Sequence, residues 1–594
     1  MLGTQAISRD VLAEKYLKPG EISVQDVYRR VARALASVEA PAEQAAWERR
    51  FLENLQAGAI GAGRIMNAAG ACTGAAATLI NCFVQPVGDA IQGLDEEGYP
   101  GVDQALHEAA ETMRCGGGVG YDFSHIRPKG ADGRGLASKS SGPCSCIDVF
   151  SQSCATLQSV GARRGAQMGV LRIDHPDVLE FITAKRAPGR WNNFNVSVAV
   201  PDAFMQALVD DSDWQLVHRA RPGAVALGAG AFQREDGWWV YRTVLARELW
   251  NTVMRSAYDF AEPGILFLDP INQDNNLRYC EAIEATNPCG EQPLPPYGCC
   301  DLGPIILPRF VHHPFGLEGT PVFDVAAFER AVALQVRALD NVLDLTFWPL
   351  PQQRDEAMAK RRIGVGCTGL GNALAMLCLR YDRAEGRDMA AHIAEHMRDA
   401  AYAASISLAQ ERGAFPCFDV NGYLAPGTFA SRLPLAMQQA IRRDGIRNSH
   451  LLSIAPTGTV SLAFADNASN GIEPAFAWLY QRKKREDDGS ITDYAVEDHA
   501  WRVYRDLGGD VHALPDYFLS ALSMSAGDHI AMMQAVQPMV DAAISKTVNV
   551  AVNFPFEDFK GLYLQAWRAG LKGLTTYRPN VILGSVLHAC RPSA

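Results

Sequence analysis

Residues 192–200, NNFNVSVAV, place β-branched and aromatic side chains at alternating positions, as a buried strand requires. Two other short runs have the same character, SHLLSIA at 449–455 and TVNVAVNF at 547–554. Between such runs lie long segments with apolar residues at helical spacing, for example 326–345 and 390–413. Strands that alternate with helices from about residue 64 onward predict an α/β body.

The N-terminal part of the chain has a different pattern. Residues 10–56 carry apolar positions at helical spacing in VYRRVARALASVEA and AAWERRFLENL, and the glycines from Gly58 to Gly63 end the pattern. We therefore expect a helical N-terminal region over 1–60. The α/β body is expected over 61–585, followed by a short tail over 586–594.

The composition limits the class of protein. The chain has 594 residues, 48% of them hydrophobic, and a formal charge of -11, which argues against bulk binding to nucleic acid or acidic membranes. The start lacks the pattern of a signal peptide, and no uncharged apolar run approaches the roughly 18 residues of a membrane helix. A cytoplasmic protein is expected, and its fourteen cysteines should be reduced thiols. No two of them form a C-x-x-C pair, so no structural metal site is predicted.

One pentapeptide concentrates reactive groups. In Asn287-Pro288-Cys289-Gly290-Glu291 the proline restricts the residue before it, and the glycine permits unusual backbone angles after the cysteine. If the segment is extended, an amide, a thiol and a carboxylate point to one side. For the pentapeptide taken alone, a loop with a buried cysteine and a solvated glutamate is the favoured interpretation.

Three other segments strengthen the catalytic interpretation. Residues 455–461, APTGTVS, follow an apolar run and form a loop suited to holding phosphate, with an ordinary capped turn as the alternative. The glycines at 116–118 allow close backbone approach to a ligand, although such clusters also occur in tight turns. Residues 81–84 and 297–302 add further cysteines.

Together these segments resemble the large chains of ribonucleotide reductases, especially the adenosylcobalamin-dependent class II branch. The resemblance runs from about residue 61 to 580. The motifs that carry it are NPCGEQPL at 287–294, PTGTVS at 456–461, RRGAQMG at 163–169 with DHPDVLEF at 174–181, and GLKGLTTYR at 570–578. It implies a ten-stranded α/β barrel with a central finger loop.

The resemblance also implies roles for the cysteines. Cys289 becomes a thiyl radical and removes the 3' hydrogen, Glu291 takes the proton of the 3'-hydroxyl group, and Asn287 helps to hold the substrate hydroxyls. Cys82 and Cys300 reduce the 2' carbon and end as a disulfide, with Cys299 as the fallback for Cys300. The expected substrate-binding residues are Arg64, Asn81, Gly117, Ser141, Asn287, Pro456, Thr457, Gly458, Thr459 and Val460.

The branch follows by exclusion and resemblance. The class I tyrosine pair is absent near Tyr577, and no glycyl radical motif is present, which leaves adenosylcobalamin as the radical source. A site for a dNTP or ATP specificity effector is expected, and the start lacks the pattern of an ATP cone. Its residues would be Asp89, Arg127, Lys129, Arg163 and Arg164; four solvated surface cations are the alternative reading of the basic ones.

The resemblance also predicts partners. The substrate is a ribonucleotide; the sequence does not decide between a diphosphate and a triphosphate, and a diphosphate is expected. The sequence also leaves the oligomeric state open, and a homodimer is expected. Thioredoxin or a glutaredoxin-type protein is the expected reductant. Because the tail carries Cys590 without a C-x-x-C pair, a second chain is expected to supply the missing terminal thiols. A class I-type chain with a separate radical subunit and a non-catalytic nucleotide-binding paralogue are the alternatives.

Overall fold

The computed structural model describes residues 2–71, 76–133, 136–156, 165–485, 490–579 and 587–589. Its N-terminal region is helical, with α1 (Ala6–Lys15), α2 (Val24–Ala36), α3 (Gln44–Ala57) and the short α4 (Gly63–Ala68). Helix α2 begins with a capping box between Ser23 and Asp26, which satisfies its first backbone donors. The helical pattern predicted for residues 10–56 is thus present in the structure.

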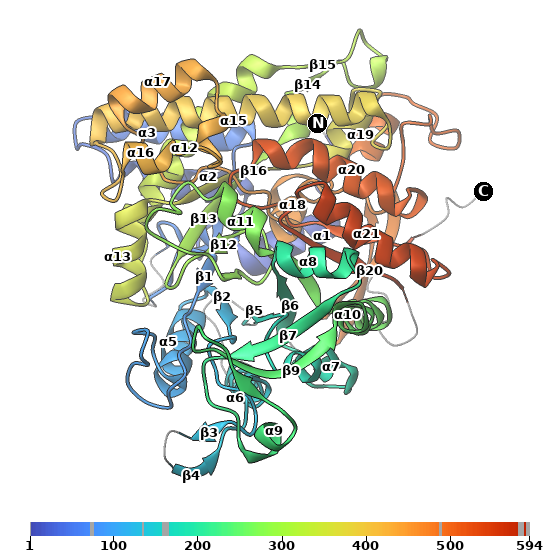
Figure 1. The fold of residues 1–594 in the computed structure, drawn as a ribbon. Coiled ribbons are helices and arrows are strands. Elements are labelled where there is room, and N and C mark those ends of the chain that lie inside the picture. Colours follow the sequence, from blue (N-terminus) through green and yellow to red (C-terminus); the bar gives the residue numbers. More distant parts are fainter. Residues whose placement is uncertain are drawn as a thin grey trace.

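A nine-stranded sheet forms the centre of the molecule (Figure 1). Its order is β16 (Ile363–Thr368), β13 (Cys299–Ile306), β1 (Cys82–Val84), β2 (Gly118–Asp122), β5 (Gln167–Arg172), β6 (Phe194–Val200), β10 (Gly264–Phe267), β20 (Gly573–Tyr577) and β19 (Thr547–Asn549). The predicted strand at 192–200 is β6. The predicted strand at 547–554 is shorter than expected and ends at Asn549.

The sheet consists of two parallel halves. In one half, strands β1, β2, β5, β6 and β10 run parallel to one another. The other half consists of two parallel pairs at opposite edges of the sheet, β13 with β16 and β19 with β20. The halves meet in antiparallel pairs, β1 with β13 and β10 with β20. Each half is connected in chain order, which is the pattern of repeated strand–helix–strand units.

Residues 450–454 connect the two edges of this sheet. Leu452 bridges Val365 of β16, and Ile454 bridges Ile544, which lies just before β19; both bridges are parallel. The amide of Ser453 donates to the carbonyl of Val365, and that of Ile454 donates to the carbonyl of Ala543. With this segment as a tenth member, the arrangement corresponds to the predicted ten-stranded α/β barrel.

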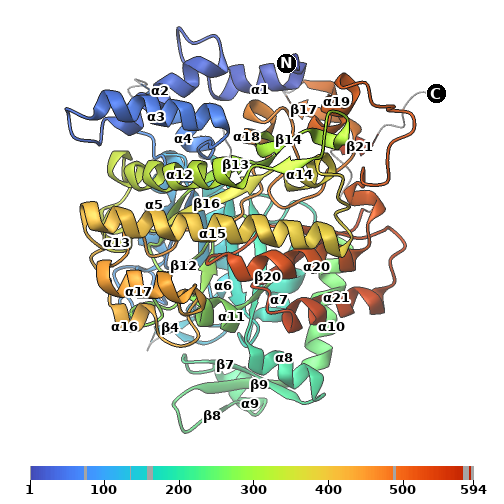
Figure 2. The same ribbon diagram turned by 90° about the horizontal axis from the view of Figure 1, so that it is seen from above.

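Helices cover the outside of the strands. One half packs against α5 (Val102–Arg114), α6 (Pro143–Thr156), α10 (Ala246–Phe260) and α21 (Phe556–Arg568). The other half packs against the N-terminal helices, α12 (Val325–Leu345) and α15 (Ala384–Arg412), the last two of which run side by side in Figure 2. A smaller apolar cluster fills the inside of the sheet, and it includes Ala285 and Leu294 from the stem of an inserted loop.

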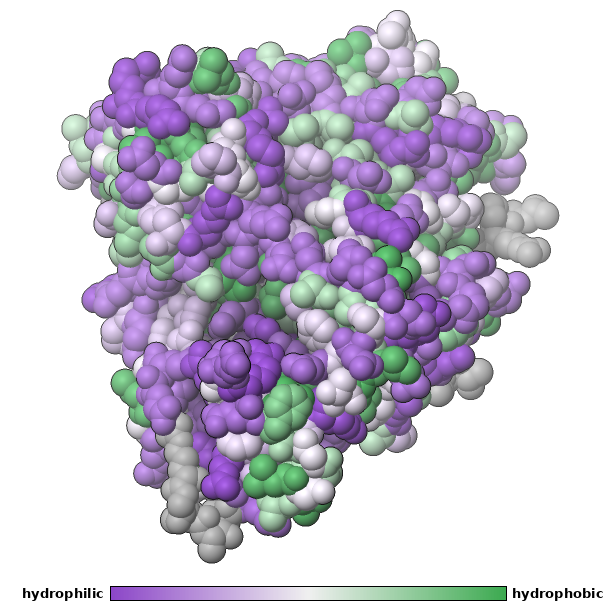
Figure 3. All heavy atoms as spheres, in the orientation of Figure 1, coloured by the Kyte–Doolittle hydropathy of each residue, from purple (hydrophilic) through white to green (hydrophobic). Residues whose placement is uncertain are grey.

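The surface is mostly polar. Figure 3 shows hydrophilic residues over most of one face, with small separate apolar areas between them. Among the described residues, no helix combines the length and apolar character needed to cross a membrane.

Candidate active site

The pentapeptide of interest forms the tip of a loop inside the sheet. Its stem is a two-stranded hairpin of β11 (Ala285–Thr286) and β12 (Pro293–Leu294), and residues 287–292 lie between these strands. The amide of Gly290, which has φ 81°, donates to the carbonyl of Asn287, so the chain turns sharply around Cys289. We call residues 285–294 the finger loop. Cys289 is exposed at its tip.

Close packing fixes the position of the finger loop. A Cβ atom at Gly120 of β2 would lie 1.7 Å from the carbonyl oxygen of Thr286, so only glycine lets the stem approach this strand. The side-chain amide of Asn195 on β6 donates to the carbonyl of Pro288 over 2.8 Å. Ser453 Oγ and the amide of Ala543 both donate to the carbonyl of Glu291. Neighbouring strands therefore hold both the stem and the tip.

The register of β1 and β13 pairs two of the cysteines. Cys82 lies directly opposite Cys300, whereas Cys299 lies opposite Phe83. Side chains alternate between the faces of a strand, so Cys82 and Cys300 point into the barrel and Cys299 points outward into the packing with the helices. Directly opposed residues of an antiparallel pair have Cβ atoms about 4.5–5.5 Å apart, close to the range of a disulfide. This geometry favours Cys300 over the fallback Cys299.

The amide and the carboxylate of the finger loop both reach this cysteine pair. Asn287 Nδ2 donates to Cys82 Sγ over 3.0 Å, and Cys82 Sγ lies 3.8 Å from Glu291 Oε1. Asn287 and Glu291 are almost completely buried. Burial also raises the pKa of the Cys300 thiol well above its ordinary value, and the neighbouring carboxyl of Asp301 adds to this effect. Cys300 is therefore held as a neutral thiol, which suits a donor of hydrogen and electrons.

A first cavity of about 200 Å³ opens on one side of the finger loop. It contains Cys82, Asn287, Cys289 and Glu291, while Cys300 lies next to Cys82 in the barrel wall. The predicted substrate-binding residues that line it are Arg64, Asn81, Gly117, Asn287, Pro456, Thr457, Gly458, Thr459 and Val460. Ser141 is exposed and is not among the lining residues.

Two polar groups of this cavity are well placed to bind a ligand. Asn81 Oδ1 is buried and has no hydrogen-bond partner within the described chain, so a hydroxyl group of a ligand would satisfy it. Arg64 is only 4% exposed, and its guanidinium lies beneath Gly116, where a Cβ atom would approach it to 2.4 Å. The glycine at 116, with φ 101°, thus makes room for this cation.

The first threonine of the predicted phosphate loop, Thr457, fixes the conformation of this loop. Thr457 has φ 57°, and its hydroxyl contacts Thr368 Oγ1 at 2.8 Å and accepts from the amide of Gly471. Helix α18 (Gly458–Phe464) follows at once. The side chain of Thr457 is therefore engaged in fixing the loop.

Sequence reasoning missed one wall of the first cavity. Lys15, Tyr16 and Asn67 from the N-terminal helices line it, together with Leu302 and Pro304 of β13. No motif marks these residues. Their contribution depends on the packing of the helical region against the barrel.

A second cavity of about 340 Å³ lies on the other side of the fingertip. The two cavities share only Pro288, Cys289 and Pro456 among their lining residues. The wall of the second is formed by β6, β10, β20 and residues 543–547. The exposed thiol at 289 therefore lies between two separate binding spaces.

The predicted effector residues are brought together only in part. Arg127 forms a two-pronged ion pair with Asp89, whose oxygens lie 2.9–3.1 Å from its nitrogens. Lys129 Nζ instead reaches Glu180 at 3.4 Å and is largely exposed. Arg163 and Arg164 lie outside the described residues, as does Cys590.

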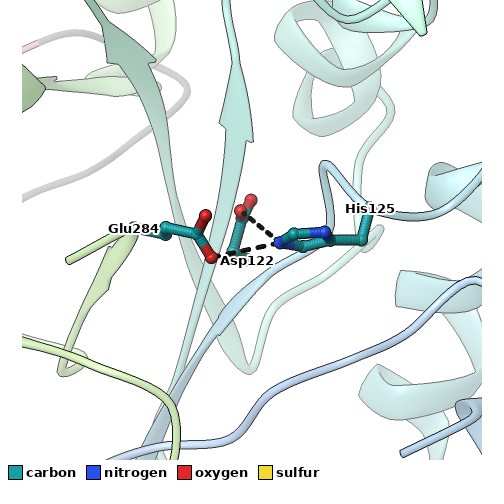
Figure 4. Close-up of side chains that lie close together, drawn as sticks. All are labelled: Asp122, His125 and Glu284. Carbon is teal, nitrogen blue, oxygen red and sulfur yellow. Dashed lines mark hydrogen bonds and ion pairs between the residues drawn. The ribbon is translucent and has the colours of Figure 1, made fainter. Parts of the chain in front are cut away.

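Asp122, His125 and Glu284 form a cluster of titratable groups (Figure 4). His125 lies two residues before Arg127 in the chain, and Glu284 directly precedes the finger loop. His125 Nε2 lies 3.1 Å from Glu284 and 3.6 Å from Asp122, and the three residues have an arrangement able to hold a metal ion. Burial opposes protonation of His125, but the hydrogen bond to Glu284 and the charge of Asp122 outweigh it and raise the pKa to about 9. Near neutral pH the cluster is thus an ion-pair network, in which the imidazolium itself supplies the positive charge.

The sequence matches known proteins along most of its length. A family model described as "Ribonucleotide reductase, barrel domain" matches residues 80–577, and one described as "Ribonucleotide reductase, all-alpha domain" matches residues 2–74. The "Vitamin B12-dependent ribonucleoside-diphosphate reductase" of Mycobacterium tuberculosis (strain CDC 1551 / Oshkosh) is 34% identical over 98% of this chain and 80% of its own length.

Other relatives include the protein of the same name from Thermoplasma acidophilum, which is 29% identical over 84% of this chain and 61% of its own length. The "Ribonucleoside-diphosphate reductase subunit alpha" of Synechocystis is 26% identical over 95% of this chain and 74% of its own. Together with the finger loop inside the barrel, these matches show that the chain belongs to the ribonucleotide reductase family.

Proposed function

We propose that this chain is the catalytic chain of an adenosylcobalamin-dependent (class II) reductase that converts ribonucleotides to 2'-deoxyribonucleotides for DNA synthesis. The observation that carries the proposal is the position of Cys289, at the tip of a loop between two cavities. One cavity offers the hydroxyl-binding, acid–base and thiol groups that the reaction needs. The other gives a large cofactor separate access to the same sulfur.

The first cavity binds the substrate. Asn81 and Asn287 hold the ribose hydroxyls, and the loop at 456–460 holds the phosphates, with Arg64 as a nearby cation. Glu291, which lines the same cavity, takes the proton of the 3'-hydroxyl group. The names of the relatives from M. tuberculosis and T. acidophilum favour a ribonucleoside diphosphate as the substrate.

The second cavity is suited to the cofactor. Its wall combines apolar side chains, including Leu266, Met533 and Leu574, with the backbone of strand ends, and it reaches Cys289 from the side opposite the substrate. A bulky cofactor with one reactive group directed at the thiol fits this arrangement. When bound there, adenosylcobalamin would supply the radical chemistry that activates the Cys289 thiol.

The remaining steps use groups of the chain itself. The Cys289 sulfur removes the 3' hydrogen atom of the ribose while Glu291 accepts the 3'-hydroxyl proton. The 2'-hydroxyl group then leaves as water, because an adjacent radical weakens its bond to carbon. Cys82 and Cys300 supply two electrons and two hydrogens, one of which leaves in the water and one of which bonds to the 2' carbon, and they become a disulfide. Glu291 returns its proton to the 3' oxygen, and Cys289 returns its hydrogen to the 3' carbon.

Each cycle leaves a disulfide that must be reduced again. Thioredoxin or a glutaredoxin-type protein is the proposed external reductant. Asp89, Arg127 and Lys129 are the described residues of the proposed site for a dNTP or ATP effector, in which the effector phosphates would compete with Asp89 for Arg127 and with Glu180 for Lys129. The proposed active form is a homodimer.

An anaerobic assay tests the proposal. The chain is incubated with a ribonucleoside diphosphate, an effector, dithiothreitol and adenosylcobalamin, and deoxyribonucleotide is measured. We expect product with the wild type and none with Cys289→Ser, while Cys82→Ser still attacks the substrate and releases free base. Product that requires a metal-containing radical subunit, or that persists in Cys289→Ser, contradicts the proposal. Binding of nucleotide without any turnover indicates a non-catalytic paralogue instead.

A further inference from the structure

The C-terminal end of α1 lies beside the phosphate loop. Helix α1 packs against α18, the helix that begins at Gly458 directly after the turn of that loop. Tyr16, the residue after α1, places its ring 4.8 Å from that of Phe464 in α18. Lys15 and Tyr16 line the first cavity together with residues 456–460. The last turn of α1 is thus part of the cavity wall nearest the loop.

The backbone at this position is fixed. The side-chain amide of Asn67 donates to the carbonyl of Lys15. Asn67 lies on α4, three residues after Arg64, so both residues project from one face of that short helix. The same face of α4 therefore anchors Lys15 and presents Arg64 to the cavity.

The ammonium group of Lys15 is not neutralised within the described chain, where it forms no ion pair or side-chain hydrogen bond. The neighbouring Glu14 is paired with Lys484 instead, at 2.7 Å. Among the described residues that line the first cavity, Glu291 is the only acid, and it belongs to the finger loop. The wall formed by the N-terminal helices is therefore cationic.

The lowered pKa of a nearby lysine, Lys18, is consistent with a positive potential in this region. The pKa of Lys18 is lowered by its partial burial and then by the charges of Arg30 and Arg64, which outweigh the opposing effect of Glu21. A surplus of positive charge around residues 15–18 and 64 makes this end of the cavity favourable for a polyanion.

We infer that Lys15 binds the outer phosphate of the substrate and so gives the site its preference for a nucleoside diphosphate over a monophosphate. The inference rests on the proposed function, because it places the phosphate chain at residues 456–460. The loop offers polar but uncharged groups, and Arg64 lies deeply buried under the glycines. Lys15, which is only partly buried and lines the same cavity, supplies a positive charge for a second phosphate.

Equilibrium binding tests this role without turnover. In the Cys289→Ser background, binding of radiolabelled cytidine diphosphate and cytidine monophosphate is measured with and without Lys15→Met. We expect Lys15→Met to weaken binding of the diphosphate about tenfold and that of the monophosphate less than about twofold. With Cys289 present, KM for the diphosphate rises by a similar factor while kcat stays within about twofold, because the contact exists in ground and transition states alike.

Arg9→Met is the matched control, since it removes one positive charge from the same helix at an exposed position outside the cavity, where Arg9 contacts the carbonyl of Thr4. It should leave both affinities unchanged, and Lys15→Arg should restore most of the diphosphate binding. Unchanged diphosphate binding in Lys15→Met overturns the inference, as does an equal loss for both nucleotides. Failure of the wild type to turn over would refute the proposed function instead, whatever the binding data show.

Discussion

Gly120→Ala is the sharpest structural test of how the finger loop is positioned. The added Cβ atom would lie 1.7 Å from the carbonyl oxygen of Thr286, whereas real Cβ atoms essentially never approach another atom below 3.0 Å. The strand and the stem must therefore separate by at least about 1.3 Å at this point. Thr286 is three residues before Cys289, so much of this movement is passed to the thiol.

The expected cost divides between activity and stability. A displacement of about 1 Å of a reacting group lowers the rate of the chemical step by roughly 100-fold. Overpacking in a close-packed core costs about 1–3 kcal/mol of unfolding free energy. We therefore expect kcat for deoxyribonucleotide formation to fall about 100-fold in a variant that still folds.

Alanine substitutions at two other glycines, Gly118 and Gly169, serve as comparisons with smaller expected effects. At Gly118 an added Cβ would lie 3.2 Å from Pro288, and at Gly169, opposite Tyr121 in the neighbouring strand, it would meet only ordinary contacts of 3.5 Å or more. Alanine should thus be nearly neutral at 169, intermediate at 118 and severe at 120. Activity is measured anaerobically and folding by urea denaturation. Wild-type kcat and stability in Gly120→Ala, or a loss at 169 as large as that at 120, would refute the reasoning.

Three further predictions concern other parts of the chain. Cys300→Ser should stop multiple turnover and release free base, whereas Cys299→Ser should continue to turn over. Chromatographic analysis of the products distinguishes these outcomes, and the reverse result would assign Cys299 to the redox pair. Glu39→Ala leaves the buried guanidinium of Arg337 without its closest partner and should cost about 3 kcal/mol in urea denaturation. Burial opposes ionisation of Glu39, but hydrogen bonds from Arg337 and Asn341 and the charges of Arg412 and Arg337 together outweigh it and lower the pKa from 4.5 to about 2. The stabilising effect of Glu39 should therefore be present above pH 4.5 and disappear as the pH falls through 2. The pKa of His125 is raised from 6.5 to about 9, so the stabilisation that it provides is complete below pH 6.5 and is lost as the pH rises through 9. This loss amounts to roughly 3 kcal/mol of unfolding free energy, and His125→Gln should abolish it. An unchanged pH profile of unfolding in this variant would count against the ion-pair network.

Much of the catalytic centre was predictable because it depends on local sequence. The proline and glycine around Cys289 predict a constrained turn, and the structure has one. The alternation of residues 192–200 predicts β6 almost to its ends. The segment 449–455 was also predicted as a strand, but its backbone bonds to two distant parts of the chain and forms only isolated bridges.

Other features depend on tertiary contacts that no local pattern records. The choice between Cys299 and Cys300 follows from the register of β13 against β1, and sequence alone could only favour one of them. Lys15 is an ordinary basic residue near the end of a helix until that helix packs against α18. Ser141, by contrast, was predicted at the substrate and lies exposed elsewhere, since the chain there begins α6 at Pro143.

The register of Cys82 and Cys300 also has a mechanical consequence. These residues lie on β1 and β13, where the two parallel halves of the barrel meet. A bond between their sulfur atoms would tie the halves together and close a loop of about 218 residues, which by chain entropy stabilises the folded state by about 5 kcal/mol. The oxidised protein at the end of a cycle would then be harder to unfold than the reduced protein that begins the next one. Reduction of the disulfide therefore restores both the two thiols and the less stable form of the protein, in which the two halves are not covalently joined.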